Sequence, residues 1–237
     1  MPRFEPSPPP SFPPPGTRCR AAAVLLVLGA VAYSAWLVEV FVATGLDPLR
    51  NYVSELAAEG EPLGGLLRTT DLVSGLLVMV AALVVLAGRT SGTRWTVTGL
   101  GALAVFGAAT VADSRVPLSC TPTADPACAE REAAGLVPAS HVAHTCTSSL
   151  AAAAALVAMA ALTVAVRRGR GRSLLARTGP WIVAAEVAAG AWTLTSVGAF
   201  EAGQGTWFLG LAQRLQVILI ALWLVLFARS LAKEGSP

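Results

Sequence analysis

Charged residues are scarce in this sequence: Asp, Glu, Lys and Arg make up 13% of the 237 residues, about half the share found in soluble domains. Hydrophobic residues make up 54%, and the mean hydropathy is +0.64. These values exclude a soluble enzyme and an intrinsically disordered chain. The net charge of +3 is distributed between apolar runs, which excludes a nucleic-acid-binding face. The composition is that of an integral membrane protein.

Motifs for soluble cofactors are absent too: there is no Gly-x-Gly-x-x-Gly after a strand and no phosphate-binding Gly-Lys-Ser/Thr loop. The sequence contains instead six apolar runs long enough to cross about 30 Å of hydrocarbon. Because unpaired backbone groups are too costly in lipid, and these runs are too long for barrel strands, we expect helices throughout. The predicted fold class is all-α, a polytopic membrane protein with a six-transmembrane-helix bundle, its spans near residues 21–43, 70–87, 95–112, 144–166, 180–200 and 207–228.

Basic residues are unevenly divided between the segments that flank these spans. Twelve lie in one alternate set, which includes both termini, and four lie in the other set, at Arg50, Arg68, Arg115 and Arg131. Since Lys and Arg accumulate on the cytoplasmic side, the sequence predicts a multi-pass plasma-membrane protein with both termini in the cytoplasm. Segment 167–177 contains five Arg and is expected to attract anionic inner-leaflet lipids, which makes membrane lipids expected partners.

Composition also divides the chain into three segments. Residues 1–20 are predicted to be a proline-rich disordered cytoplasmic tail, because eight of the sixteen prolines lie in the first fifteen positions. Residues 21–230 form the expected six-helix transmembrane domain, and residues 231–237 a second cytoplasmic tail. The proline-rich tail is either a solvated segment or the binding site of a cytoplasmic partner that recognises proline.

Two of the four cysteines, Cys120 and Cys128, lie in the long loop expected outside the membrane. In an oxidising exterior such a pair is a candidate disulfide that closes a short loop. Free thiols or half of a metal site are the alternatives, although the spacing is not the Cys-x-x-Cys of zinc sites.

Residues 45–60, after the first expected span, begin with a turn and continue with helical periodicity. The apolar residues Leu49, Tyr52, Val53 and Leu56 fall at i, i+3, i+4 and i+7. This pattern predicts a short amphipathic outer helix, capped by Asp47 with Pro48 at its first position and ended by Gly60. Such a helix would cover the outer ends of the spans as a lid, with Ser54 and Glu55 projecting inward.

Ionisable residues within the spans cost about 2.5–3.5 kcal/mol each and mark either function or internal pairing. Most of those found here lie near the outer ends of the expected spans, whereas Glu186 lies nearer the cytoplasmic side. The sequence therefore predicts an outward-facing polar vestibule whose ligand-binding candidates are Glu39, Ser54, Glu55, Asp71, Asp113, His141, His144 and Arg214.

Arg214 lies about 10 Å inside the sixth expected span, at nearly the same depth as Glu39 in the first. One interpretation is an internal salt bridge that fixes helix packing. The other is that Arg214, with Gln213 and Gln216, contacts an anionic headgroup or a substrate carboxylate.

The only two histidines, His141 and His144, share one helix face with Ser148. Two imidazoles one turn apart, with Asp113 or Asp71 as a third ligand and water as a fourth, are compatible with a divalent metal. Acid/base or hydrogen-bonding roles and structural capping of the helix are the alternatives. The metal candidates are His141, His144 and Asp113, and the catalytic candidates are His141, Asp113 and Glu55.

The segment Asp47-Pro48-Leu49-Arg50-Asn51-Tyr52-Val53-Ser54-Glu55-Leu56, an Asp at the outer end of the third span, and His141 opening the fourth span together resemble the bacterial membrane family known as domain of unknown function 998 (DUF998). The resemblance covers residues 21–230 and implies a six-helix integral membrane protein. A looser similarity links the chain to the membrane hydrolase superfamily that includes alkaline ceramidases, whose zinc site uses histidines, an Asp and a Ser. The chain departs from that pattern with two histidines rather than three and six spans rather than seven.

The function expected from these features is the binding of a lipid or another amphiphile in the outer vestibule. One alternative is a metal- or acid/base-dependent membrane enzyme that acts on a lipid or isoprenoid. Another is a small transporter or an accessory subunit, which would show inverted repeats or broken helices. A structural partner protein is a further alternative.

Overall fold

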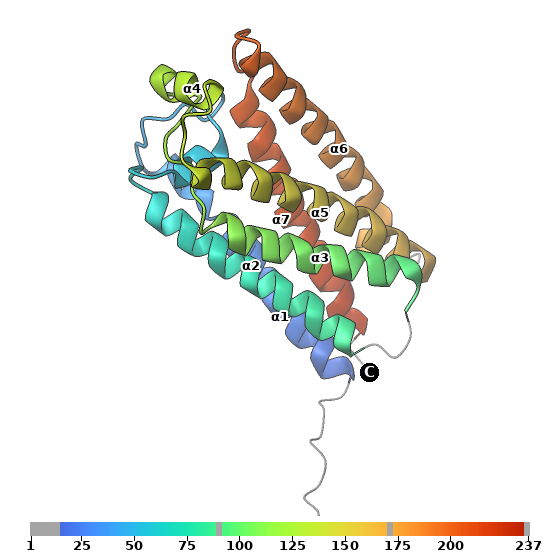
Figure 1. The fold of residues 1–237 in the computed structure, drawn as a ribbon. Coiled ribbons are helices and arrows are strands. Elements are labelled where there is room, and N and C mark those ends of the chain that lie inside the picture. Colours follow the sequence, from blue (N-terminus) through green and yellow to red (C-terminus); the bar gives the residue numbers. More distant parts are fainter. Residues whose placement is uncertain (1–14, 89–91, 170–172, 235–237) are drawn as a thin grey trace, which may run out of the picture.

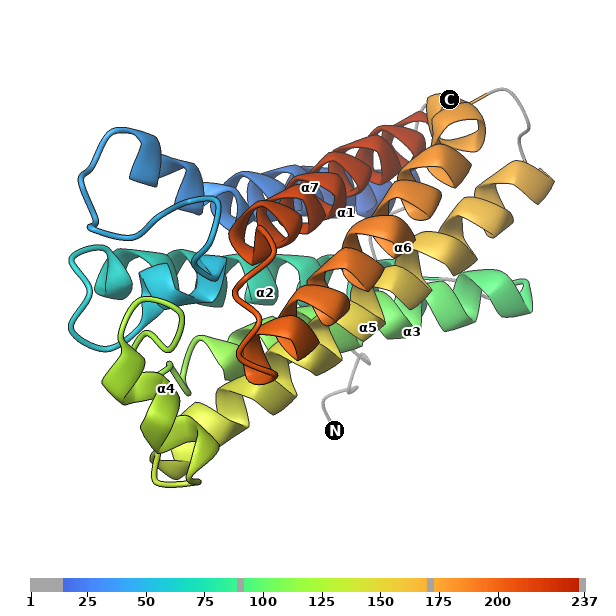
Figure 2. The ribbon, with the colours of Figure 1, turned by 90° about the horizontal axis from the view of Figure 1, so that it is seen from above.

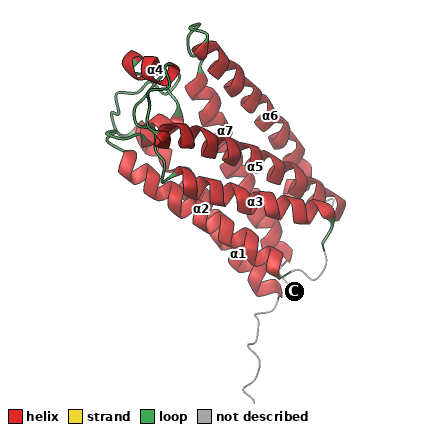
Figure 3. Cartoon of the chain, in the orientation of Figure 1, coloured by secondary structure: helices red, strands yellow, loops and turns green. Residues whose placement is uncertain are grey.

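A computed structural model describes residues 15–88, 92–169 and 173–234 of the chain (Figure 1). The described residues form helices, turns and loops without a strand (Figure 3). The first fourteen residues of the expected proline-rich tail lie outside this part, as do Arg89, Arg170 and Arg172.

Within the described part of the chain, six helices are long and apolar enough to cross a membrane. This number confirms the all-α, six-span fold class predicted from the apolar runs. The six are α1 (Pro15–Tyr33), extended by the 3₁₀ helix η1 (Ala35–Val40), then α2 (Gly64–Ala87), α3 (Arg94–Asp113), α5 (Ala139–Gly169), α6 (Leu174–Glu201) and α7 (Leu209–Glu234).

The ends of the helices differ from those expected. Helix α1 begins at Pro15 and gives way to a 3₁₀ helix after Tyr33 instead of continuing to residue 43. The Ser34 hydroxyl donates to the carbonyl of Ala30 (2.9 Å) at this transition, a local bond that competes with regular helix geometry. Helix α7 begins two residues later than expected, because Trp207 and Phe208 have left-handed backbones (φ 45° and 57°) that an α-helix excludes.

The six helices form a closed ring in chain order, and Figure 2 shows α7 beside α1 and α6. Helix α1 packs against α2, α2 against α3, α3 against α5, α5 against α6, α6 against α7, and α7 returns to α1. Leu26, Phe106, Met159 and Trp223 are among the fully buried side chains of the core inside this ring. Because consecutive helices are antiparallel neighbours, the polar residues near their loop ends are brought together.

Small residues set the distance between several of these helices. A Cβ atom added to Gly75 of α2 would lie 2.6 Å from the carbonyl oxygen of Gly107 in α3. A Cβ atom added to Gly107 would lie equally close to the carbonyl oxygen of Gly75. Gly99 is similarly close to Leu162 of α5, whereas Gly101 meets nothing within 4 Å. Gly99 therefore lies at a close helix interface and Gly101 does not.

One end of the ring, which we call the loop end, has two long structured segments, residues 41–63 and 114–138, and the short loop 202–208 between α6 and α7. The first was predicted to contain a short amphipathic helix; the structure has in this place a turn at 48–50 followed by a short 3₁₀ helix η2 (Val53–Ala57). The helix is interrupted because the carbonyl of Asn51 accepts a hydrogen bond from Arg214 and the N–H of Tyr52 donates to Glu55.

The second loop segment contains α4 (Pro126–Ala133), which was not predicted. Asp125 caps this helix by accepting from the N–H of Ala127 (3.0 Å), and Pro126 occupies its first turn. The same Asp-Pro signal is present at Asp47-Pro48, where Asp47 accepts from the N–H of Leu49 (2.9 Å). In both places the pair initiates a turn of helix.

Candidate functional site

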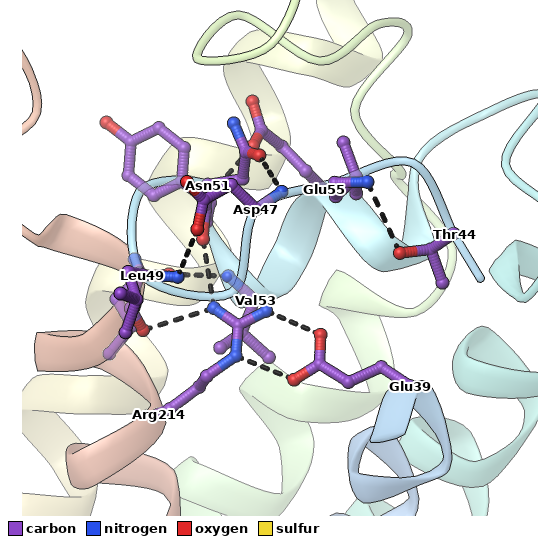
Figure 4. Close-up of polar contacts among 12 residues, drawn as sticks. Glu39, Thr44, Asp47, Leu49, Asn51, Val53, Glu55 and Arg214 are labelled. Carbon is purple, nitrogen blue, oxygen red and sulfur yellow. Dashed lines mark hydrogen bonds and ion pairs between the residues drawn. The ribbon is translucent and has the colours of Figure 1, made fainter. Parts of the chain in front are cut away.

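The first loop segment is docked on the start of α7. Arg214 forms two hydrogen bonds to the Glu39 carboxylate, from Nε (2.7 Å) and from Nη2 (2.6 Å), and both side chains are almost fully buried. Its Nη1 atom donates to the carbonyls of Asn51 (3.0 Å) and Gly210 (3.1 Å). Figure 4 shows the guanidinium between Glu39 and the turn at 47–51. The salt bridge expected from the similar depths of Glu39 and Arg214 is therefore present.

These contacts engage Arg214 on every side. Glu39 neutralises the charge of Arg214. The guanidinium carbon lies over the Trp36 ring, 5.8 Å from the ring centroid. The neighbouring Gln213 accepts from the N–H of Val53 (3.0 Å), which holds η2 against α7. Arg214 is thus a structural support for the first loop segment.

Glu55 connects the two loop segments. Its carboxylate accepts from the N–H of Thr123 (2.7 Å), from the Thr123 hydroxyl (2.5 Å) and from the N–H of Tyr52 (3.0 Å). Burial raises the pKa of Glu55 to about 6, although these hydrogen bonds act in the opposite direction. The inward projection expected of Glu55 is not what the structure has, because its carboxylate caps η2 and binds Thr123.

The second loop segment is closed by a disulfide between Cys120 and Cys128. The adjacent Ser119 contacts His141: its hydroxyl lies 3.0 Å from Nδ1, and its N–H donates to the same atom (3.3 Å). The Nε2 atom of His141 lies 3.3 Å from Glu132 in α4. His141 therefore joins α5 to the second loop segment.

Beneath the first loop segment lies a cavity of about 190 Å³, which we call the central cavity. It is lined by side chains of α1, η1, both loop segments, α2, α3, α5 and α7. Half of the eight expected vestibule residues line this cavity: Ser54, Asp71, Asp113 and His144. The other half lie outside the lining and hold the surrounding segments together: Glu39, Glu55, His141 and Arg214.

His144 and Asp113 form a pair at this cavity. Nδ1 of His144 lies 3.2 Å from Oδ1 of Asp113, and the same carboxylate oxygen accepts from the Thr147 hydroxyl. Neither ring nitrogen of His144 has a hydrogen bond of good geometry within the described residues. Ser148, one turn farther along α5, also lines the cavity. The arrangement is a carboxylate, an imidazole and a hydroxyl around one space.

Asp71 and Arg68 contribute a second group of charges to the cavity lining. Nη1 of Arg68 donates to the carbonyls of Ala57 (2.6 Å) and Ala58 (3.2 Å). Arg68 therefore supports the end of η2. Within the described residues, Asp71 has neither a hydrogen bond nor an ion pair, and its main electrostatic neighbour is Asp113.

The expected metal ligands are not gathered at one point. His141 faces Ser119 and Glu132, while His144 faces Asp113. Among the described residues, no group of three or more His, Cys, Asp or Glu side chains has the arrangement of a metal site. The one-turn spacing places both imidazoles on α5, but His141 faces the second loop segment whereas His144 faces the end of α3.

Glu186 is buried in α6, and Gln216 of α7 donates to one of its carboxylate oxygens (3.2 Å). The carbonyl oxygen of the Gln216 side chain accepts from Thr193 (2.6 Å). Gln216 also lines the central cavity, whereas α6 contributes no side chain to that lining. Gln216 therefore connects Glu186 to the lining of the central cavity.

Sequence reasoning did not identify Tyr33, Trp36 and Arg68 as lining residues. Arg68 lies three positions before Asp71, a spacing that places both on one helix face, so it could have been found from the sequence. Tyr33 is one of only two tyrosines and lies near the loop end of α1, but its burial against Phe106 has no sequence signal.

Comparison with known families gives one result for this chain. The sequence model of the family described as "Protein of unknown function (DUF998)" matches residues 26–230. No curated protein and no solved structure matches the chain. The match covers four of the six candidate membrane helices in full, parts of the first and the last, and both loop segments.

Proposed function

The chain belongs to the DUF998 family, and we propose that it binds a lipid or another amphiphile, with the headgroup in the central cavity. The observation that carries the proposal is the mixed lining of that cavity. Asp71, Asp113 and His144 are polar, whereas Leu67, Val217 and Ile220 are apolar. A ligand with one polar end and one apolar end matches such a surface.

The size of the cavity limits what enters it. At about 190 Å³ it is smaller than the roughly 300 Å³ at which sites for drug-sized ligands begin. It therefore accommodates a headgroup but not the acyl chains. Ala152 of α5 lines the cavity and is also exposed, which supports an opening beside α5 through which a chain extends.

A pair of substitutions on α5 tests this proposal. Ala152→Trp puts an indole into the cavity, whereas Ala153→Trp adds the same side chain at an exposed position outside the lining. Native mass spectrometry of the purified proteins measures the amphiphile that remains bound. We expect Ala152→Trp to lose the bound amphiphile and Ala153→Trp to retain it; equal retention in both variants would contradict the proposal.

Acid/base catalysis on the bound amphiphile is a second candidate, and the pair of His144 and Asp113 supports it. An imidazole with a carboxylate 3.2 Å away is a pair of groups that general acid/base catalysis uses. If the site is catalytic, His144→Gln retains amphiphile binding but abolishes turnover. Turnover unchanged in His144→Gln would eliminate this candidate.

For the membrane orientation we propose a plasma-membrane location with the loop end outside and both termini in the cytoplasm. The distribution of Lys and Arg supports this choice. Arg167 and Arg177 line a groove with Trp181 at the opposite end of the bundle, where anionic inner-leaflet lipids are expected partners. A cytoplasmic partner for the proline-rich tail remains a proposal from composition alone.

A further inference from the structure

We infer that the central cavity selects an amphiphile whose polar end is a primary ammonium group. The inference rests on the proposed function and specifies its ligand. It is carried by the Asp71 carboxylate, which lines the cavity on α2 and makes no hydrogen bond or ion pair within the described residues. Asp71 begins the third turn of a candidate membrane-spanning helix, where an unpaired carboxylate is costly.

The positive groups near Asp71 are engaged elsewhere. Arg214 is bound to Glu39 through two short hydrogen bonds and does not line the cavity. Arg68 does line it, but its Nη1 donates to two backbone carbonyls at the end of η2. No protein cation is therefore hydrogen-bonded to Asp71 in the described part of the chain.

The lining contains two acidic side chains, Asp71 and Asp113, and one basic side chain, Arg68. When both acids are ionised, they carry two negative charges against the single positive charge of Arg68. The two carboxylates also interact electrostatically with each other, so a monovalent cation between them relieves a repulsion. An anionic headgroup would instead add to the negative charge.

Hydrogen-bonding capacity distinguishes an ammonium from other cations. Carboxylates only accept, and an ammonium group carries three N–H donors and no acceptor. The second oxygen of Asp113, the carboxylate of Asp71 and the hydroxyl of Ser148 are acceptors in the lining. A trimethylammonium group has the charge but no donors, and a hydroxyl group has one donor but no charge, so neither satisfies the site fully.

Four probes with the same twelve-carbon chain separate these properties: dodecylamine, dodecyltrimethylammonium, dodecanol and dodecyl sulfate. Their binding to the full-length protein in a non-ionic detergent is measured by native mass spectrometry or isothermal titration. We expect dodecylamine to bind at least about tenfold more tightly than dodecanol or dodecyltrimethylammonium, since one good charged hydrogen bond is worth a factor of this size. Dodecyl sulfate should bind most weakly.

Asp71→Asn should remove the preference for dodecylamine while leaving the binding of dodecanol unchanged. Glu59→Gln is the matched control, because Glu59 is exposed in the first loop segment and lies outside the cavity lining. The comparison of probes on the wild-type protein is informative even if Asp71→Asn does not fold. A preference that survives in folded Asp71→Asn overturns the assignment to Asp71.

Two further outcomes separate the inference from the proposed function. If the probes bind but dodecylamine has no advantage over dodecanol or dodecyltrimethylammonium, the ammonium inference is wrong and amphiphile binding stands. If none of the four probes binds the folded wild-type protein, both the inference and the proposed function are overturned.

Discussion

Replacing Arg214 with Met should strongly destabilise the loop end of the bundle. The substitution keeps most of the side-chain volume but removes both hydrogen bonds to Glu39 and those to the carbonyls of Asn51 and Gly210. Glu39 is then left buried without its cation. Removing one partner of a buried ion pair typically costs about 3–5 kcal/mol, and we expect a loss of this size in the free energy of unfolding.

The assay is reversible unfolding in mixed micelles, followed by circular dichroism or tryptophan fluorescence. Arg131→Met is the control, because the pair of Arg131 and Asp125 is separated by 4.0 Å and about half exposed, so its loss should cost less than about 1 kcal/mol. The double variant Glu39→Gln, Arg214→Met should be more stable than Arg214→Met alone, since it removes the unpaired charge. If Arg214→Met is as stable as Arg131→Met, the reasoning about this ion pair is refuted.

Three further predictions concern the loop segments and the helix ring. Burial raises the pKa of Glu55 from 4.5 to about 6, so its stabilising contribution is present below pH 4.5 and is lost as pH rises through 6. In denaturation curves, the free energy of unfolding of the wild type should therefore fall by about 2 kcal/mol over this range relative to that of Glu55→Gln. Replacing Cys120 and Cys128 with Ser should lower stability by about 2–3 kcal/mol, measured in the same way, and a smaller loss under oxidising conditions than under reducing ones would contradict the disulfide. Gly75→Val should destabilise the contact of α2 with α3 by at least about 1–3 kcal/mol, whereas Gly101→Val, whose Cβ meets nothing within 4 Å, should melt like the wild type.

The parts of this structure that depend on local pattern and depth could be predicted from the sequence. Apolar run length identified six helices, since a span needs about 20 apolar residues. Similar depth in two spans identified Glu39 and Arg214 as partners, because a buried charge requires a counter-charge. The position of ionisable residues near the outer ends of the spans also selected Asp71, Asp113 and His144, which line the cavity.

The parts that depend on contacts between loops could not be predicted. Thr123 lies 68 positions from Glu55, and no periodicity connects them, so the inward projection of Glu55 was a reasonable but wrong expectation. The two histidines share a helix face, yet Ser119 and Glu132 hold His141 away from His144. The short η2 takes the place of the longer expected helix because Arg214 and Gln213 of α7 bind the backbone at Asn51 and Val53, and helical propensity does not contain that information.

Photo-cross-linking with an amphiphile that carries a diazirine next to its ammonium group tests the central claim most directly. Peptide mapping by mass spectrometry locates the labelled residues on the wild-type protein, Ala152→Trp and Ala153→Trp. The account predicts labels at cavity residues such as Ser148 and Val217 in the wild type and Ala153→Trp, and their loss in Ala152→Trp. Labels confined to residues outside the cavity lining, with the same pattern in all three proteins, would contradict it.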